Sequence, residues 1–278
     1  MTTDLMILTD VHLCHIDWSG MTSADRLRGM AERLRGEYAA KPYAAQLFLG
    51  DYSLDFWQWD VGGSWVREGI SNTARFVKTI LPALPAPSCM IPGNHEQYGP
   101  ALWRAITGGN RQFCLTVGGW LIICLDTFAG DLDPEKHSDG TYTGADVGFI
   151  ADALASHPGT PVLLCAHFFP MPAESEAFLR LLSTEKRIRG LFCGHDHLGF
   201  RETLPCGIPF FHCGHYSYPG GGNTLAQLPW GYLRLTLAED GFRAVYIFPE
   251  NEAEGETIAR AERDEGFFPL VPEAEKKG

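Results

Sequence analysis

Five short segments of the sequence place aspartate, asparagine or histidine directly after an apolar run. They read Thr-Asp-Val-His at 9–12, Gly-Asp at 50–51, Gly-Asn-His-Glu at 93–96, Ala-His at 166–167 and Gly-His-Asp-His at 194–197. Carboxylate oxygens, amide oxygens and imidazole nitrogens are donors that bind divalent metal ions in proteins. Cysteine is absent from the set, which disfavours a closed structural zinc site. The residue types therefore predict a metal site of oxygen and nitrogen ligands.

The spacing within the first and last segments supports this interpretation. Asp10 and His12 are two residues apart, as are His195 and His197. On an extended backbone, residues i and i+2 point to the same side, so each pair is expected to bind one ion or two neighbouring ions. Each segment alone is typical of a turn or of a buried core residue. The five occur together and in order, and this joint occurrence favours one shared site.

The apolar runs before these segments predict the strands that position them. Buried strands are predicted at 5–8, 46–49, 88–91, 120–125, 161–165 and 190–193. Helical patterns lie between many of them, at 23–38, 72–84 and 145–156. This alternation is typical of an α/β fold with largely parallel pairing, in which ligand sites form outside the carboxyl ends of the strands. Later strands, predicted without intervening helices at 208–212, 231–237 and 242–248, are expected to close the domain with antiparallel pairing.

Composition bounds the class of protein. The chain has 278 residues, of which 45% are hydrophobic and 20% are charged, as expected for a globular domain. We assign residues 1–249 to a single domain and the acidic segment 250–278 to a C-terminal appendage or tail. The net charge of −12 argues against nucleic acid or an anionic membrane as the main partner.

We expect neither membrane insertion nor export of this chain. No apolar run reaches about 18 residues, so no membrane insertion is expected. The N-terminus has no basic flank and no cleavage site, so we expect no signal peptide and a cytoplasmic location. The eight cysteines are scattered along the chain, several of them in apolar runs, as expected for reduced and buried thiols.

Together the five segments resemble the signature of the calcineurin-like metallophosphoesterases, and the likeness spans roughly residues 5–200. Members of this family fold as two mixed β-sheets packed face to face as a sandwich, flanked by helices, and they hydrolyse phosphate esters. The resemblance therefore implies an α/β sandwich with two divalent or trivalent metal ions, chosen from Mn, Fe, Co and Zn. Two such ions neutralise the phosphate, lower the pKa of a bridging water and align the in-line attack.

The resemblance also implies roles for eight polar residues of the five segments. Carried over by position, the first ion is bound by Asp10, His12 and His197, the second by Asn94, His167 and His195, and both by the bridging Asp51. His95 is the implied catalytic residue, which contacts the phosphate and protonates the leaving group.

Departures from the family pattern indicate which branch of the superfamily the sequence resembles. Serine/threonine phosphatases of this superfamily carry Gly-Asp-x-Val-Asp-Arg-Gly, with a phosphate-binding arginine, whereas the run at 50–56, which ends in Phe56, contains no arginine. Purple acid phosphatases carry a tyrosine ligand at the position of Leu54. The Leu-Asp-Thr segment at 125–127, followed by a predicted helix, is similar to the bacterial phosphodiesterase-like branch. We therefore predict a metal-dependent hydrolase of a small phosphodiester, with a small-molecule phosphomonoesterase as the alternative.

Two other functions are less favoured. A nuclease is disfavoured by the net charge and by the lack of a basic stripe in the sequence. A non-catalytic scaffold is disfavoured because all seven implied ligands and His95 are present.

Four residues are candidates for lining the substrate: Phe56, Trp57, Trp59 and His215. The three aromatic residues soon after Asp51 either cover the core or form an apolar wall beside the metals. His215 and the glycine-rich loop after it either line the active site or lie away from it. A diester carries a second organic group that such a wall can bury, and one negative charge less than a fully ionised monoester. Both properties favour a diester substrate.

Overall fold

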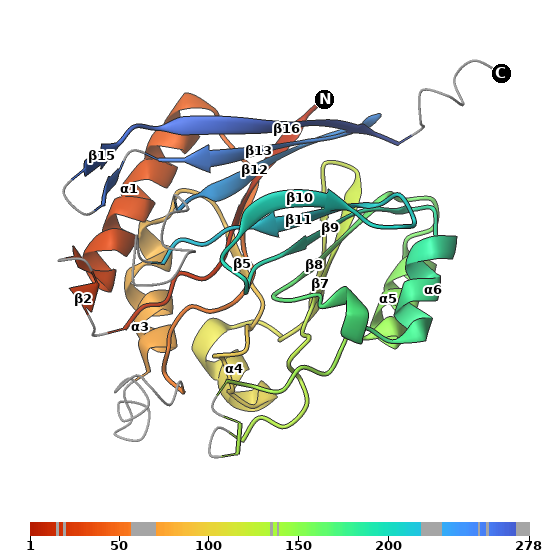
Figure 1. The fold of residues 1–278 in the computed structure, drawn as a ribbon, viewed down its shortest axis with the longest axis horizontal. Helices are drawn as coiled ribbons and strands as arrows, with labels where there is room; N and C mark the ends of the chain where they lie inside the picture. Colours follow the sequence, from red (N-terminus) through yellow and green to blue (C-terminus); the bar gives the residue numbers. More distant parts are fainter. Residues whose placement is uncertain are drawn as a thin grey trace.

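Two mixed sheets of six strands each pack face to face, and helices cover their outer faces (Figure 1). The computed structural model describes residues 1–14, 17–18, 21–56, 71–133, 136–137, 139–217, 230–249, 251–253 and 256–270. The first sheet has the strand order β16-β13-β12-β1-β4-β5, and the second has the order β10-β11-β9-β8-β7-β6. The predicted α/β sandwich of mixed sheets is confirmed.

The strands and helices have the following bounds. The first sheet consists of β1 (Thr3–Leu8), β4 (Ala45–Phe48), β5 (Ser88–Met90), β12 (Tyr232–Ala238), β13 (Gly241–Phe248) and β16 (Ala261–Pro269). The second sheet consists of β6 (Phe113–Val117), β7 (Trp120–Leu125), β8 (Val162–Ala166), β9 (Ile188–Cys193), β10 (Gly199–Thr203) and β11 (Pro209–Cys213). The helices are α1 (Ser23–Ala40), α3 (Asn72–Thr79), α4 (Pro100–Thr107), α5 (Val147–Ser156) and α6 (Glu176–Thr184), with 3-10 turns η1 (Leu81–Ala83) and η2 (Met171–Ala173). Short strands form two further pairs, β2 (Asp17–Trp18) with β3 (Met21–Thr22) and β14 (Asn251–Ala253) with β15 (Glu256–Ile258).

Parallel pairs occupy the part of each sheet that carries the polar segments. β1 pairs in parallel with β4, and β4 with β5. In the second sheet β7, β8, β9 and β11 pair in parallel in that order. Every apolar run predicted as a strand forms one. Three strands of the two large sheets, β6, β10 and β16, are missed from the sequence, and all three lie at or near sheet margins. β10 and β16 are largely exposed and lack an apolar run, whereas β6 is partly buried.

The apolar core has three layers. One lies between the sheets, where Leu5, Leu163 and Phe242 are buried together. A second lies between the first sheet and helices α1, α3 and α4, and a third between the second sheet and helices α5 and α6. β7 is buried along its whole length because both of its faces are covered. These layers fix the strand ends from which the polar segments emerge.

One helix ends earlier than predicted, and two helices, α4 and α6, are absent from the prediction. The helix predicted over 72–84 ends at Thr79, because Pro82 follows and cannot continue it. Helix α4 is absent from the prediction, although its terminal signals are present in the sequence. Pro100 lies in its first turn, and Gly108 ends it in a left-handed conformation with φ of 77°.

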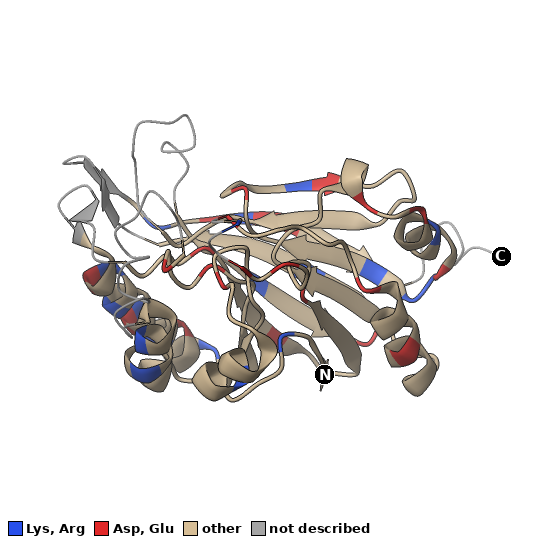
Figure 2. Ribbon diagram, turned by 90° about the horizontal axis from the view of Figure 1, so that it is seen from below, with Lys and Arg blue, Asp and Glu red and all other residues tan. Residues whose placement is uncertain are grey.

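Strand β16 lies within the segment predicted as an appendage, and it forms the edge of the first sheet. It pairs antiparallel with β13, where Phe268 faces Phe242 and their rings stack at 4.9 Å. Residues 261–269 are therefore part of the sandwich, while the domain boundary at residue 249 stays a prediction. Figure 2, turned by 90°, shows basic and acidic positions interspersed over the described ribbon. None of the described helices combines the length and the apolarity needed to cross a membrane.

Candidate metal centre

The polar segments meet where the parallel strands end. The loops after β1 and β4 continue the strand pairing, since Asp10 N donates to Gly50 O at 3.1 Å and His12 N donates to Asp51 O at 3.0 Å. His167 follows β8 directly, and the His195 loop follows β9. All eight predicted ligands and catalytic residues come together here, and Asp10 and His167 are fully buried.

Five residues of this region have left-handed backbone. In the described chain, positive φ outside glycine occurs at Asp10 (51°), His12 (45°), Asp51 (57°), His195 (74°) and His197 (58°). Such backbone costs about 1–3 kcal/mol per residue and persists where the surrounding structure imposes it, often at functional sites. The extended backbone assumed for the Asp10–His12 and His195–His197 pairs is therefore wrong. Left-handed turns bring these side chains together instead.

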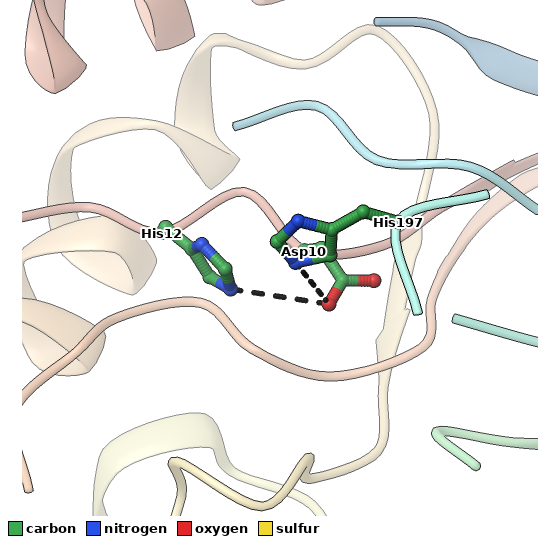
Figure 3. A group of neighbouring side chains, drawn as sticks. All are labelled: Asp10, His12 and His197. Carbon is green, nitrogen blue, oxygen red and sulfur yellow. Dashed lines mark ion pairs between the residues drawn. The ribbon is translucent and has the colours of Figure 1, made fainter. Parts of the chain in front are cut away.

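A first group of possible ligands consists of Asp10, His12 and His197 (Figure 3). Asp10 Oδ1 lies 3.3 Å from His197 Nε2 and 3.9 Å from His12 Nε2. This oxygen is buried and has no hydrogen-bond partner among the described residues. A buried carboxylate oxygen without a hydrogen bond is costly, and a cation between these three side chains would satisfy it.

A second group consists of Asp51, His167 and His195, and Asn94 joins it. Asn94 Oδ1 lies 2.9 Å from His167 Nε2 and 3.0 Å from His195 Nδ1. His167 Nδ1 lies 2.7 Å from the carbonyl oxygen of Leu49, which places the proton on Nδ1. Nε2 is then free to bind a metal ion, and the backbone contact fixes the orientation of the ring.

Asp51 lies between the two groups. Its Oδ2 is 3.4 Å from His12 Nε2, 3.3 Å from His167 Nε2 and 3.7 Å from His95 Nε2. Burial alone would raise the pKa of Asp51, but the charges of His167 and His95 outweigh it and hold this pKa well below its usual range. Asp51 is therefore an anion that contacts both groups.

The pocket stabilises positive charge. Burial lowers the pKa of His167, but the Asp51 carboxylate outweighs burial and raises it to about 10. Burial also opposes protonation of His197, and Asp10 raises its pKa. His12 behaves differently, because burial lowers its pKa to about 4. Two buried carboxylates thus draw cations to a set of oxygen and nitrogen donors, which fits bound metal ions.

Glu96 has a structural role that the sequence analysis did not assign. Its fully buried carboxyl group accepts hydrogen bonds from the backbone N–H of Asp51 at 2.8 Å, of Tyr52 at 2.9 Å and of Gly93 at 2.9 Å. Burial, with the charge of Asp51, raises the pKa of Glu96 to about 8. One side chain therefore ties the loop after β4 to the loop after β5. The Gly-Asn-His-Glu segment contains this residue, but its partners are set by tertiary contacts.

Contacts of Asp196 and of the His195 ring fix the loop between His195 and His197. Asp196 Oδ1 accepts from Leu198 N at 3.1 Å, and Asp196 Oδ2 lies 2.5 Å from His212 Nδ1. Phe168, which is partly buried, packs on the other side, where its ring centre lies 4.2 Å from that of His195. Sequence reasoning missed these residues as part of the site because they lie beside ligands without being ligands.

The candidate substrate-lining residues have different positions. Phe56 is partly buried and packs on Tyr98 at a ring distance of 4.9 Å, next to the core layer under α1 and α3. Trp57 and Trp59 lie outside the described residues. His215 is buried and its ring stacks on His197 at 5.1 Å. Burial lowers the pKa of His215 to about 3, so this ring is neutral beside the first group.

Comparisons with known proteins bear on the family and the fold. A family model described as calcineurin-like phosphoesterase matches residues 4–199. No curated protein matches the sequence. Among solved structures, a dimetal phosphatase from Danio rerio is similar, with 14% identity, a TM-score of 0.59 and coverage of 94% of this chain and 98% of that chain.

Two further solved structures share the fold. One is GAP50, the anchor in the inner membrane complex of Plasmodium, with 13% identity, a TM-score of 0.55 and coverage of 95% of this chain and 89% of that chain. The other is a purple acid phosphatase from yellow lupin (Lupinus luteus) seeds, with 15% identity, a TM-score of 0.51 and coverage of 94% and 53%, respectively. At these identities the likeness shows the fold alone.

Proposed function

The chain belongs to the calcineurin-like phosphoesterase family, and we propose that it is a two-metal enzyme that hydrolyses a small phosphodiester. The observation that carries this proposal is the position of Asp51, whose Oδ2 lies within 3.4 Å of a histidine from each group of possible ligands. When bound, two metal ions would neutralise the phosphate, lower the pKa of a water and align an in-line displacement.

The ligand assignment follows from the two groups. Besides Asp51, which would contact both ions, the proposed ligands are Asp10, His12 and His197 for one ion and Asn94, His167 and His195 for the other. The buried Asp10 Oδ1 and the inward-facing Nε2 of His167 support this assignment, since both are oriented to bind a cation.

His95 is the proposed general acid. Its backbone N–H donates to Asp51 Oδ1 at 3.2 Å, and its Nε2 lies 3.7 Å from Asp51 Oδ2. The ring therefore borders the place where a phosphate bound to both ions would lie. From there His95 can contact a phosphate oxygen and donate a proton to the leaving oxygen.

Charge around the site supports a diester over a monoester. Residues 52–56, which follow Asp51, contain no arginine to bind a phosphate, and the ring of Phe56 packs on Tyr98. Asp139, whose side chain is 68% exposed, places Oδ1 at 3.7 Å from His95 Nε2. A carboxylate beside the phosphate site repels a dianion about twice as strongly as a monoanion. The charge of the site therefore favours a singly charged diester over a doubly charged monoester.

The same fold occurs in a protein described as an anchor and in proteins described as phosphatases, so fold alone does not decide whether the chain is catalytic. The full set of possible ligands favours catalysis. A scaffold would have no need for strained backbone at five residues that face one another.

The test compares two esters with the same leaving group. The protein is stripped with a chelator, reloaded with Mn, Fe, Co or Zn, and assayed on bis(p-nitrophenyl) phosphate and p-nitrophenyl phosphate. We expect no hydrolysis without metal and a higher kcat/KM for the diester. A higher kcat/KM for the monoester would replace the proposal with the phosphomonoesterase. No hydrolysis of either ester with any of the metals would favour the scaffold.

A further inference from the structure

A turn that the sequence presents as an ordinary surface loop packs against the candidate ligand Asn94. Gly140 N donates to His137 O at 3.0 Å, and Gly140 has φ of +68°. A Cβ added at Gly140 would lie 2.6 Å from Asn94 O and 3.1 Å from Asn94 Cα. Both the backbone conformation and the close approach therefore require glycine at this position.

The residue before this glycine binds the Asn94 amide. Asn94 Nδ2 donates to Asp139 Oδ1 at 2.8 Å, while Asn94 Oδ1 faces His167 Nε2 at 2.9 Å. An amide has one donor end and one acceptor end, so the partner of Nδ2 decides which end faces the histidines. If the amide flipped, its oxygen would face the Asp139 carboxylate and its NH₂ group would face the proposed ion. Both contacts would be repulsive.

The segment that carries Asp139 is fixed on its far side. Thr143 donates to Thr127 O through its backbone N at 2.9 Å and through Oγ1 at 3.1 Å. The Tyr142 hydroxyl donates to Glu174, and the Tyr142 ring packs on Phe128 at 5.7 Å. The segment 139–143 is therefore held at one end by the contact of Asp139 with Asn94 and at the other end by the contacts of Tyr142 and Thr143. The Asp139 side chain itself is largely exposed.

We propose that Asp139 is a positioning residue for the metal centre, which orients the Asn94 amide so that Oδ1 faces the ion. Gly140 sets the place of Asp139 by allowing the turn to approach Asn94. This inference rests on the proposed function, because it takes Asn94 as a ligand. Groups that orient metal ligands in this way typically contribute 10- to 100-fold in metal affinity, and we expect about tenfold because Asp139 is exposed.

The experiment measures metal affinity rather than activity. Zn²⁺ and Mn²⁺ dissociation constants are determined on stripped protein by competition with a chromophoric chelator, for wild type, Asp139→Ala, Asp139→Asn and the control Asp131→Asn. Asp131 lies in the same segment and pairs with Lys136 and His137. We expect Asp139→Ala to weaken one of the two ions about tenfold and leave the other within a few-fold. Asp139→Asn should retain most of the affinity, because its amide oxygen still accepts from Asn94 Nδ2, and Asp131→Asn should match wild type.

A double-mutant cycle separates this role from a general structural one. In an Asn94→Ala background, Asp139→Ala should cause no further loss of metal affinity, since the oriented group is gone. Gly140→Ala should weaken the same ion as Asp139→Ala, with thermal unfolding of the stripped proteins as the check on folding.

Four results would overturn the inference. They are wild-type affinity for both ions in Asp139→Ala, equal weakening by Asp131→Asn, additive losses in the cycle, and an Asp139→Asn variant as weak as Asp139→Ala. If wild type binds two ions and hydrolyses esters while Asp139→Ala binds them equally well, only the positioning role fails. If wild type binds no ions, the proposed function fails with it.

Discussion

The two halves of the candidate site are built differently. The first-sheet half comprises the loops after β1, β4 and β5, which carry Asp10, His12, Asp51, Asn94 and His95. Its loops are joined by backbone hydrogen bonds and by one buried carboxylate, Glu96. The second-sheet half comprises the loops after β8 and β9, which carry His167, His195 and His197. Its loops are joined by one backbone hydrogen bond, from Gly194 N to His167 O at 2.8 Å. Its rings are positioned by several separate contacts, such as Leu49 O on His167, Phe168 on His195 and His212 on Asp196.

The difference predicts how each half responds to substitution. In the first half, Glu96 alone accepts three backbone hydrogen bonds and joins the loops after β4 and β5. Loss of Glu96 should therefore affect both loops. In the second half, several separate contacts hold the histidine rings, so removal of any one contact should have a small effect. The halves meet closely, since a Cβ added at Gly194 would lie 2.0 Å from Thr9 Oγ1. Asp51 contacts histidines from both.

The largest effect is expected for Asp51→Asn, because Asp51 belongs to the first half yet contacts both groups of ligands. Loss of its charge should weaken both ions and reduce kcat/KM by about 10³-fold or more. Metal content after dialysis and hydrolysis of bis(p-nitrophenyl) phosphate measure this effect. Two ions bound at normal affinity with near-normal turnover would show that the two groups do not share this residue.

His95→Ala should separate catalysis from metal binding within the first half. The variant should keep both ions, because His95 is not a proposed ligand, and lose about 10²–10⁴-fold in kcat. The loss should be smaller for p-nitrophenyl esters than for alkyl esters, since a good leaving group needs less protonation. Equal losses for both kinds of ester would reject the general-acid role.

The strands and polar loops of this site are readable from the sequence for a simple reason. Parallel strands buried on both faces are apolar runs, and the residues after them must face the sheet edge. The strained backbone of Asp10 and His195 is not readable, because neighbouring loops impose it. Asp139 is missed for the same reason, since a loop of Lys136, His137 and Asp139 resembles any solvated turn. Its role depends on Asn94, which lies 45 residues away.

β16 illustrates the opposite difficulty. Its sequence is acidic and its residues are largely exposed, as in a solvated tail. The edge of a sheet needs only one apolar face, and in β16 that face is short. Here Phe268 on Phe242 supplies it, and backbone pairing with β13 supplies the rest. Composition alone therefore cannot separate a charged edge strand from a tail.

Glu96→Gln tests whether one residue holds the loops of the first half in place. The substituted amide keeps one acceptor but directs an NH₂ group at backbone donors. We expect both ions to bind about 10- to 100-fold more weakly. Unfolding in urea should show a loss of about 1–3 kcal/mol from backbone groups left without partners.

A matched control for this substitution is Glu239→Gln, whose side chain is 90% exposed. It should leave metal affinity and unfolding unchanged. If Glu96→Gln behaved like this control, the loops after β4 and β5 would owe their positions to strand pairing alone, and the contrast between the halves would disappear.

The smallest effect is expected for Phe168→Leu in the second half. The substitution keeps an apolar side chain but removes the ring that packs on His195 at 4.2 Å. Aromatic pairs contribute about 0.5–1.5 kcal/mol beyond burial, so affinity for the ion bound by His195 should fall by a few-fold and at most about tenfold. The ion bound by Asp10 and His12 should be unaffected, because Phe168 packs on the other group. Chelator competition on the stripped protein measures both ions. A loss as large as that of Glu96→Gln, or an equal loss at both ions, would mean that the second half also depends on one dominant contact, and that the two halves are built alike.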